Sequence, residues 1–211
     1  MTAVIPVLAW AIAVRAAEDE SVRPSPVETV EIRPRMEQLS TTAGLDKPPS
    51  SRDLALSRAE MQRRFRESFS HANTAAGARL AAETLLTAAI TENDRSLKWM
   101  MLDEARRLGE ASGQASLVNR AITMAAAAYD VDAIDMELRC LKQIPLRGLD
   151  AQRASSLASA AENIATRAEA DQRLDKAASA TLLAYRAWQR AGNKEAAHRA
   201  AVRHDALVQA K

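Results

Sequence analysis

The sequence predicts an all-α protein in which antiparallel helix pairs stack as an α-solenoid similar to a tetratricopeptide-repeat array. Alanine, the best helix former and a poor strand residue, makes up roughly a fifth of the 211 residues. From residue 51 onward, apolar residues recur at helical spacing between short polar breaks, and Pro145 is the only proline. An irregular α-helical bundle is the alternative, because it would contain the same helices without a repeating order of packing.

Charge and cysteine content exclude some classes of protein. The formal net charge is +2 and both signs are interspersed, so no specific nucleic-acid partner is predicted. The single cysteine, Cys140, excludes an intramolecular disulfide framework and a cysteine-based zinc site. We expect Cys140 to be a small apolar residue on a buried helix face.

The first 17 residues differ in character from the rest. Residues 3–14 (AVIPVLAWAIAV) are uncharged and apolar, but this run is shorter than the ~20 residues that span a bilayer. It resembles the apolar region of a secretory signal followed by the cleavage pattern Val14-Arg15-Ala16, although no basic residue precedes it. Residues 1–17 are therefore predicted to be a signal peptide, and an uncleaved anchor or a buried helix are the alternatives. This prediction implies that the protein is exported to the periplasm, the cell envelope or the medium. It would contact a membrane only through residues 1–17, if they are not cleaved.

Residues 18–50 are predicted to be a flexible linker. Proline fixes φ and removes a backbone donor, so no helix runs through a stretch with this spacing of prolines. The low apolar content leaves the segment little to bury. The prolines of this stretch are Pro24, Pro26, Pro34, Pro48 and Pro49.

Residues 51–211 are predicted to be an α-helical repeat domain of eight helices, each with one apolar face at i, i+3/i+4, i+7 spacing. In chain order the faces are Leu54–Met61–Phe65–Phe69–Ala72; Leu80–Ala81–Leu85–Ala88–Ala89; Leu97–Met101–Ala105–Leu108; Leu117–Val118–Ala121–Ile122–Ala125–Ala128–Tyr129; Val131–Ile134–Leu138–Leu141; Leu157–Ala161–Ile164–Ala168; Leu174–Ala178–Leu182–Tyr185–Trp188; and Ala197–Ala200–Ala201–His204–Val208.

The breaks between these faces contain helix-start and helix-stop residues. Gly113 and Gly192 are placed to close helices in the left-handed conformation, and Pro145 with Gly148 enforces a stop. Connections this short make consecutive helices antiparallel neighbours. The predicted N-terminal caps are Asn73-Thr74, Asp94, Asp132, Asp150 and Asn193.

Two stretches that begin at Leu102 and Leu182 align with each other. Each contains an apolar-striped helix, a glycine stop and an alanine-rich second helix. The turn at residues 191–197 (AGNKEAA) is similar to the turn inside a tetratricopeptide repeat. Gly113 and Gly192 lie roughly 80 positions apart, which fits two units of about 40 residues.

Further features follow one another in a fixed order between residues 65 and 138. They are Leu80-Ala81 before Leu85-Leu86, Asp94 before Leu97, Leu102 with Glu104-Ala105, Gly113, and Tyr129-Asp130-Val131-Asp132. Together they resemble a helical segment that recurs in exported proteins of planctomycete bacteria, over about a third of the chain. The resemblance implies a repeat scaffold and export, and it implies no established activity. The chain departs from that pattern because no recognisable catalytic domain accompanies the segment.

Few residues are candidates for chemistry. Asp130–Val131–Asp132 most simply ends one helix and caps the next, with too few oxygens for Ca²⁺. Glu195 and His198 have the spacing of a di-iron half-site, but no second pair exists, and we expect a solvated helix start. The basic run at residues 61–66 is expected to be a solvated face with Phe65 pointing inward.

The remaining candidates are expected to be structural. Glu137–Lys142 and Asp103–Arg107 are predicted to be intrahelical surface pairs. Trp99 and Trp188 are expected in the core or at its edge.

These observations predict a non-catalytic helical-repeat scaffold that binds another protein in the cell envelope. A purely structural helical bundle in a larger assembly is the alternative, and an enzyme with an unrecognised site ranks last. No catalytic, cofactor-binding or metal-binding residue and no cofactor are predicted. The binding residues and the oligomeric state are left open by the sequence.

Overall fold

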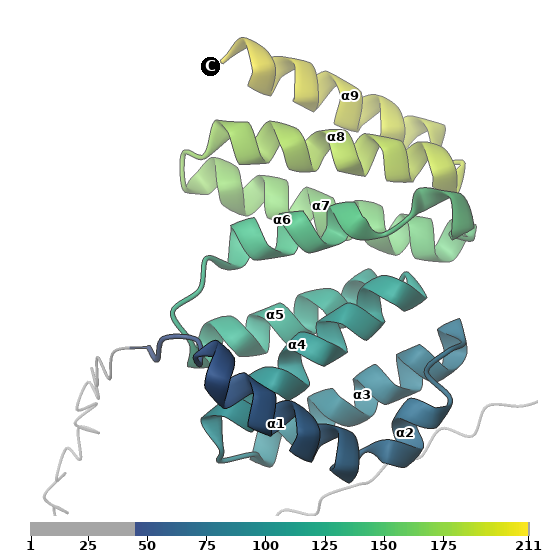
Figure 1. Cartoon of the computed structure of the whole chain (residues 1–211). Helices are drawn as coiled ribbons and strands as arrows, with labels where there is room; N and C mark the ends of the chain where they lie inside the picture. Colours follow the sequence, from purple (N-terminus) through teal and green to yellow (C-terminus); the bar gives the residue numbers. More distant parts are fainter. Residues whose placement is uncertain (1–44, 211) are drawn as a thin grey trace, which may run out of the picture. The chain divides into compact units, whose positions relative to one another are not determined.

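The computed structural model describes residues 45–210, whose helices follow one another from the bottom of Figure 1 to the top. The predicted all-α class is confirmed, since no strand occurs in this described part. The predicted signal peptide at 1–17, and the predicted linker up to residue 44, lie outside it. The helices are α1 (Ser51–Arg64), α2 (Arg66–Ser70), α3 (Ala75–Thr91), α4 (Arg95–Ser112), α5 (Ala115–Ala128), α6 (Ala133–Gln143), α7 (Ala151–Ala170), α8 (Leu174–Ala191) and α9 (Lys194–Gln209), with a 3-10 turn η1 (Leu146–Gly148) before α7.

The first predicted helix, between Leu54 and Ala72, is divided in two. Phe65 leaves helical geometry (φ −113°, ψ 26°), and its side chain packs half-buried against the core. The chain therefore continues after Phe65 as the separate short helix α2.

The predicted helix caps are confirmed. The side chains of Thr74, Asp94, Asp132, Asp150 and Asn193 each accept a hydrogen bond from the backbone N–H three residues later. This bond satisfies one of the donors that a helix start leaves free.

The two predicted glycine stops are also confirmed, and two further breaks were missed. Gly113 (φ 69°) and Gly192 (φ 79°) end α4 and α8 in the left-handed conformation. Sequence reasoning missed Ser50, which caps α1, and Gln172, which adopts φ 58° in the turn after α7.

The helices pack in two rows. Each helix from α3 to α9 packs against the next helix along the chain. In addition, α3 contacts α5 and α5 contacts α7, while α4 contacts α6 and α6 contacts α8. Within each row the helices begin roughly 40 residues apart. At the two ends, α1 packs on α4 and α9 packs on α8.

Buried side chains form two clusters rather than one. The N-terminal cluster is built by α1, α3, α4 and α5, with Leu85, Leu86, Met101 and Leu102 among its most buried members. The C-terminal cluster is built by α5 to α9 around Leu141, Leu157 and Ile164. Many of the buried residues between the helices are alanines, whose small side chains allow neighbouring helices to approach closely.

Helix α5 lies between the two clusters and contributes to both. Ala121 and Ala125 face the N-terminal cluster, whereas Val118 and Ile122 face the C-terminal cluster. The described residues therefore have two hydrophobic clusters that meet at α5 and no single central core.

The predicted apolar faces are wrong at two positions. Leu80 is 55% exposed because the buried face of α3 runs through Ala78, Ala81 and Leu85 instead. Val208 is 49% exposed in the last turn of α9, where Leu207 is the buried residue.

Among the described residues, no helix has both the length and the apolar character needed to span a membrane.

Candidate binding groove

The hinge Asp130–Val131–Asp132 joins α5 to α6 and is held by hydrogen bonds. Asp132 caps α6 by accepting from the Asp135 N–H at 2.9 Å, and its carboxylate also pairs with Arg173 at 2.8 Å. The hydrogen bond from Arg173 is the largest cause that lowers the pKa of Asp132. Within residues 45–210, no group of three histidine, cysteine or acidic side chains is placed to hold a metal ion.

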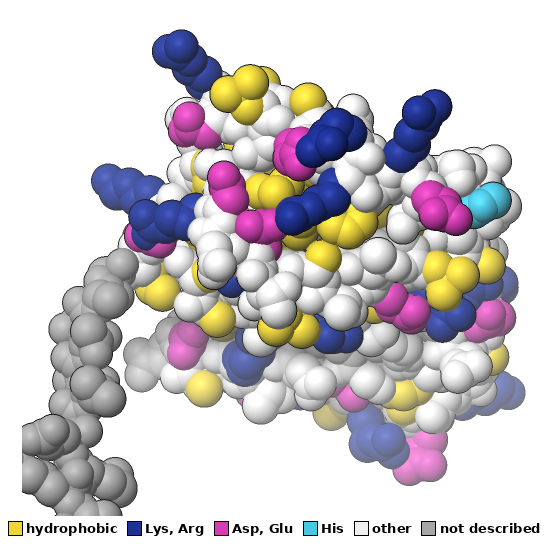
Figure 2. Space-filling model, turned by 90° about the horizontal axis from the view of Figure 1, so that it is seen from below, with side chains coloured by type: hydrophobic (Ala, Val, Ile, Leu, Met, Phe, Trp, Pro, Cys, Tyr) yellow, Lys and Arg dark blue, Asp and Glu magenta, His cyan; other side chains and the backbone are white. Residues whose placement is uncertain are grey.

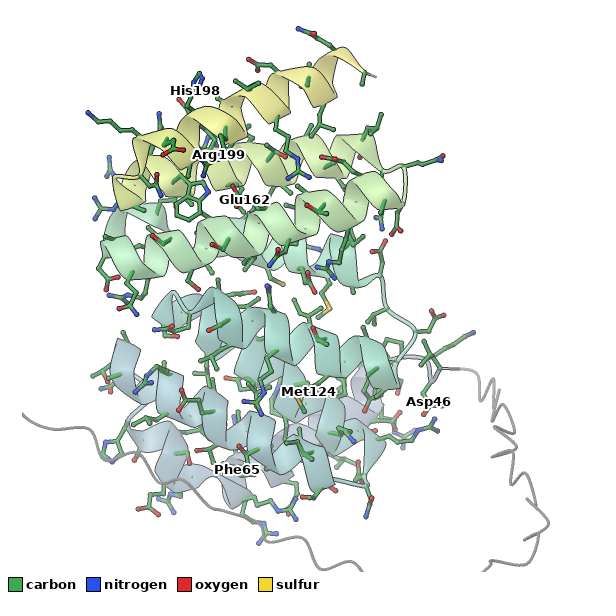
Figure 3. All side chains as sticks on the ribbon, turned by 180° about the vertical axis from the view of Figure 1, so that it is seen from behind. Asp46, Phe65, Met124, Glu162, His198 and Arg199 are labelled. Atoms are coloured by element: carbon green, nitrogen blue, oxygen red, sulfur yellow. The ribbon has the colours of Figure 1, made fainter. Side chains whose placement is uncertain are left out.

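The same hinge contacts the end of the proline-rich segment. Asp46 lies near the start of the described residues (Figure 3). It forms an isolated parallel β-bridge with Tyr129 and an ion pair with Arg95. The Tyr129 hydroxyl donates to the Arg95 carbonyl at 2.6 Å, and its ring meets Trp99 edge-on at 5.0 Å. The chain thus enters the helical domain at a fixed point on the α5–α6 turn.

The residues singled out for chemistry do not come together. Glu195 pairs with Arg199 at 2.5 Å, and His198 is exposed nearby on α9 (Figure 3). Cys140 is 5% exposed, as predicted, and its burial raises the pKa of the thiol to about 11. Trp188 is half-buried and donates to Glu162 at 2.8 Å, which is the role expected at the edge of a core.

The two predicted surface pairs are wrong. Glu137 is 2% exposed and pairs with Arg167 of α7, and Lys142 donates instead to Ser179 of α8. These partners lie far away in the sequence, so helix periodicity alone does not identify them.

The predicted Asp103–Arg107 pair is replaced by pairs with other neighbours on α4. Asp103 pairs with Arg106, which also contacts Glu110 and the Cys140 sulfur, and Arg107 pairs with Glu104. Arg106 is also the arginine that reaches Cys140 of α6, which lies outside the helix.

One groove combines apolar and basic side chains. It lies between α1, α2 and α4 and has a volume of about 530 Å³. The view from below in Figure 2 shows hydrophobic side chains gathered among basic and acidic ones on this end of the described part. Its lining residues are Arg58, Met61, Gln62, Arg66, Phe69, Glu104 and Arg107.

Each wall of the groove follows from local helix geometry. Arg58, Met61 and Gln62 share one face of α1 because they are spaced i, i+3 and i+4. Glu104 and Arg107 share one face of α4 for the same reason. The break at Phe65 starts α2 as a separate helix, and that helix supplies the third wall of the groove.

The charges of the groove are unbalanced. Arg107 is paired with Glu104 at 3.0 Å. Arg58 and Arg66 are exposed, and neither has a carboxylate partner among residues 45–210. The adjacent Arg64, by contrast, pairs with Glu92 at 2.6 Å.

Three other hollows lie elsewhere among the described residues. The hollow between α6 and α8 is crossed by the ion pair of Asp135 with Lys176 and by the bond from Lys142 to Ser179. A hollow beside Gln152 joins α3, α5 and α7 and is mainly polar, and one beside Gln189 joins α8 and α9. The polar groups of the α6–α8 hollow are therefore occupied in holding the helices together.

Only part of the groove was predictable from the sequence. The run at residues 61–66 was expected to be a solvated face with Phe65 inward, and Phe65 is half-buried as predicted. Met61, which belongs to the first predicted apolar face, is 2% exposed at the floor, whereas Glu104 and Arg107 come from a distant helix that the sequence did not bring to the groove. The i, i+3, i+4 spacing of residues 58, 61 and 62 was the available signal.

No family model, curated protein or solved structure matches the chain.

Proposed function

We propose that this protein is a non-catalytic helical-repeat scaffold that is exported to the cell envelope and binds another protein there. The observation that carries the proposal is the two-row packing of α3–α5–α7 and α4–α6–α8. Stacked helix pairs are the units from which α-solenoids are built, and the extended surface of such solenoids serves binding in many unrelated proteins.

The end of the N-terminal segment supports a tethered scaffold. Asp46 is held at the α5–α6 turn by backbone hydrogen bonds and by its ion pair with Arg95. A predicted flexible linker at residues 18–50 that is held at such an anchor attaches the domain at a defined point on its surface. The apolar residues 3–14 support export.

Site-specific photo-crosslinking in the native host tests the proposal. Each of the four hollows has one exposed glutamine on its lining, namely Gln62, Gln143, Gln152 and Gln189. Replacing each in turn by a photoreactive residue gives four matched probes.

We expect a discrete crosslinked protein from at least one probe, in an envelope fraction that contains chains lacking residues 1–16. A failure of all four probes would contradict the binding role. A mature chain that begins at Met1 in the cytoplasm would contradict export.

A further inference from the structure

Resting on the proposed binding role, we propose that the α1–α2–α4 groove binds an acidic linear segment of a partner protein with an apolar side chain beside its carboxylates. The groove combines two arginines without acidic partners in the described chain with an apolar floor. Its occupant must therefore supply negative charge and apolar surface together.

The floor of the groove fits an apolar anchor. Met61 is buried against the N-terminal cluster, and Phe69 is half-buried at the edge of that cluster. Methionine is flexible and polarizable, so it adapts to leucine, methionine or phenylalanine in a bound segment. The volume of about 530 Å³ lies within the ~300–1,000 Å³ of ordinary ligand pockets.

The rim of the groove fits carboxylates. The guanidinium groups of Arg58 and Arg66 present planar donor pairs that match the two oxygens of aspartate or glutamate. They extend from two different helices, so a bound segment contacts both α1 and α2. The Glu104–Arg107 pair forms the α4 wall without adding net charge.

The same charges disfavour a nucleic acid. Proteins that bind a phosphate backbone commonly neutralise several phosphates, and two arginines provide little of that contribution. Glu104 in the wall and the exposed Glu67 of α2 would repel a continuous run of phosphates. In an acidic peptide, by contrast, the carboxylates can be confined to the positions that face Arg58 and Arg66.

Selection from a displayed library of random short peptides on the full chain tests the proposal. We expect enriched peptides to place aspartate or glutamate next to leucine, methionine or phenylalanine. Labelled copies, titrated by fluorescence polarisation, should bind about 10- to 100-fold more weakly to Arg58→Glu/Arg66→Glu. Replacing the apolar residue of the peptide by serine should also weaken binding, and so should raised ionic strength.

The matched control is Arg120→Glu/Arg186→Glu, which reverses two exposed arginines on α5 and α8. This variant should bind the peptides as the wild type does, and circular dichroism should show unchanged helix content in both double variants. Equal losses in the two variants overturn the proposal. Enrichment of peptides without acidic residues, or of no peptides, also overturns it.

Two further measurements separate the other possible occupants. Clearly tighter binding of the labelled peptide to a full chain with Glu28→Gln/Glu31→Gln, two acidic residues of the acidic and aliphatic stretch 18–32, assigns the groove to the protein's own segment and overturns the proposal. Displacement of the labelled peptide by single-stranded oligothymidylate assigns it to nucleic acid, with the same consequence. A protein crosslinked from Gln143, Gln152 or Gln189 but not from Gln62 would support the proposed binding role. It would contradict the proposal that the α1–α2–α4 groove is the binding site.

Discussion

Asp46 and Tyr129 lie side by side in a parallel β-bridge that attaches the end of the proline-rich segment to the α5–α6 turn. The Asp130 N–H donates to the Asp46 carbonyl at 2.8 Å, and the Asp46 N–H donates to the Ala128 carbonyl at 3.4 Å. The Tyr129 hydroxyl continues the contact to the first turn of α4 through the Arg95 carbonyl. One tyrosine thus connects three segments of the chain.

Tyr129→Phe should lower the free energy of unfolding by about 0.5–1.5 kcal/mol, the usual net value of one hydrogen bond. The ring contact with Trp99 remains in this variant, so the loss reports the hydroxyl alone. Urea denaturation measures it. Tyr185→Phe is the control, because that hydroxyl contacts only the exposed Gln189, and a comparable loss there would refute the structural role of Tyr129.

The caps and glycine stops were predictable from the sequence because their interactions are local. A cap side chain bonds to the N–H three residues later, and a left-handed glycine ends its own helix, so both are encoded within one turn. The same holds for most of the buried alanine faces, which repeat with the helix period.

The interhelical contacts were not predictable in this way. Glu137 sits in a sequence pattern typical of a surface pair, yet packing against α7 buries it and gives it Arg167 as a partner. The groove has the same origin. The break at Phe65 and the approach of α1 to α4 bring Arg58 and Glu104 to one surface, and a single sequence contains no direct signal for that approach.

Arg167→Ala should destabilise the protein by about 1–3 kcal/mol, because it leaves the Glu137 carboxylate buried without its partner. The value lies below that for a fully buried pair because the Arg167 side chain is 46% exposed. Adding Glu137→Leu should recover most of the loss. Urea denaturation of both single variants and the double variant measures the coupling, and a double variant as unstable as Arg167→Ala would contradict it.

Asp132→Ala should lower stability by about 0.5–2 kcal/mol, the usual loss for an N-terminal cap. The hydrogen bond from Arg173 lowers the pKa of Asp132 from its ordinary value of 3.8. The stabilisation by its carboxylate is therefore complete above that value and is lost as the pH falls through the lower folded-state pKa. The difference between wild type and variant in urea denaturation should accordingly shrink at the acid end of a pH series.

Asp130→Ala is the matched control in the same hinge. Asp130 is exposed, and its side chain has no hydrogen-bond partner among the described residues, so the change should be nearly neutral. Added Ca²⁺ should leave the melting temperature of the wild type unchanged. A Ca²⁺-dependent rise that disappears in Asp132→Ala would make the hinge a metal site and contradict the capping role.

Gly113→Ala should cost more than Gly192→Ala. Both glycines have positive φ, which costs an alanine roughly 1–2 kcal/mol. At Gly113 an added Cβ would also lie 2.6 Å from the Leu149 Cδ2, whereas at Gly192 nothing lies within 4 Å. Thermal unfolding of the two variants measures the difference, and equal costs would show that Leu149 yields freely.

Ala125→Leu tests whether the helices behave as a stacked array. Ala125 is 3% exposed and faces the N-terminal cluster close to Trp99 and Leu102, so a leucine should overpack it by about 1–3 kcal/mol. Ala127→Leu, on the exposed side of α5, is the control and should cost much less. In an array, strain at α5 should raise hydrogen exchange in α3, α4, α6 and α7, which pack on it, while α8 and α9, which pack mainly on α7 and on each other, stay protected. A bundle with one cooperative core would instead lose protection throughout, and that result would reject the α-solenoid.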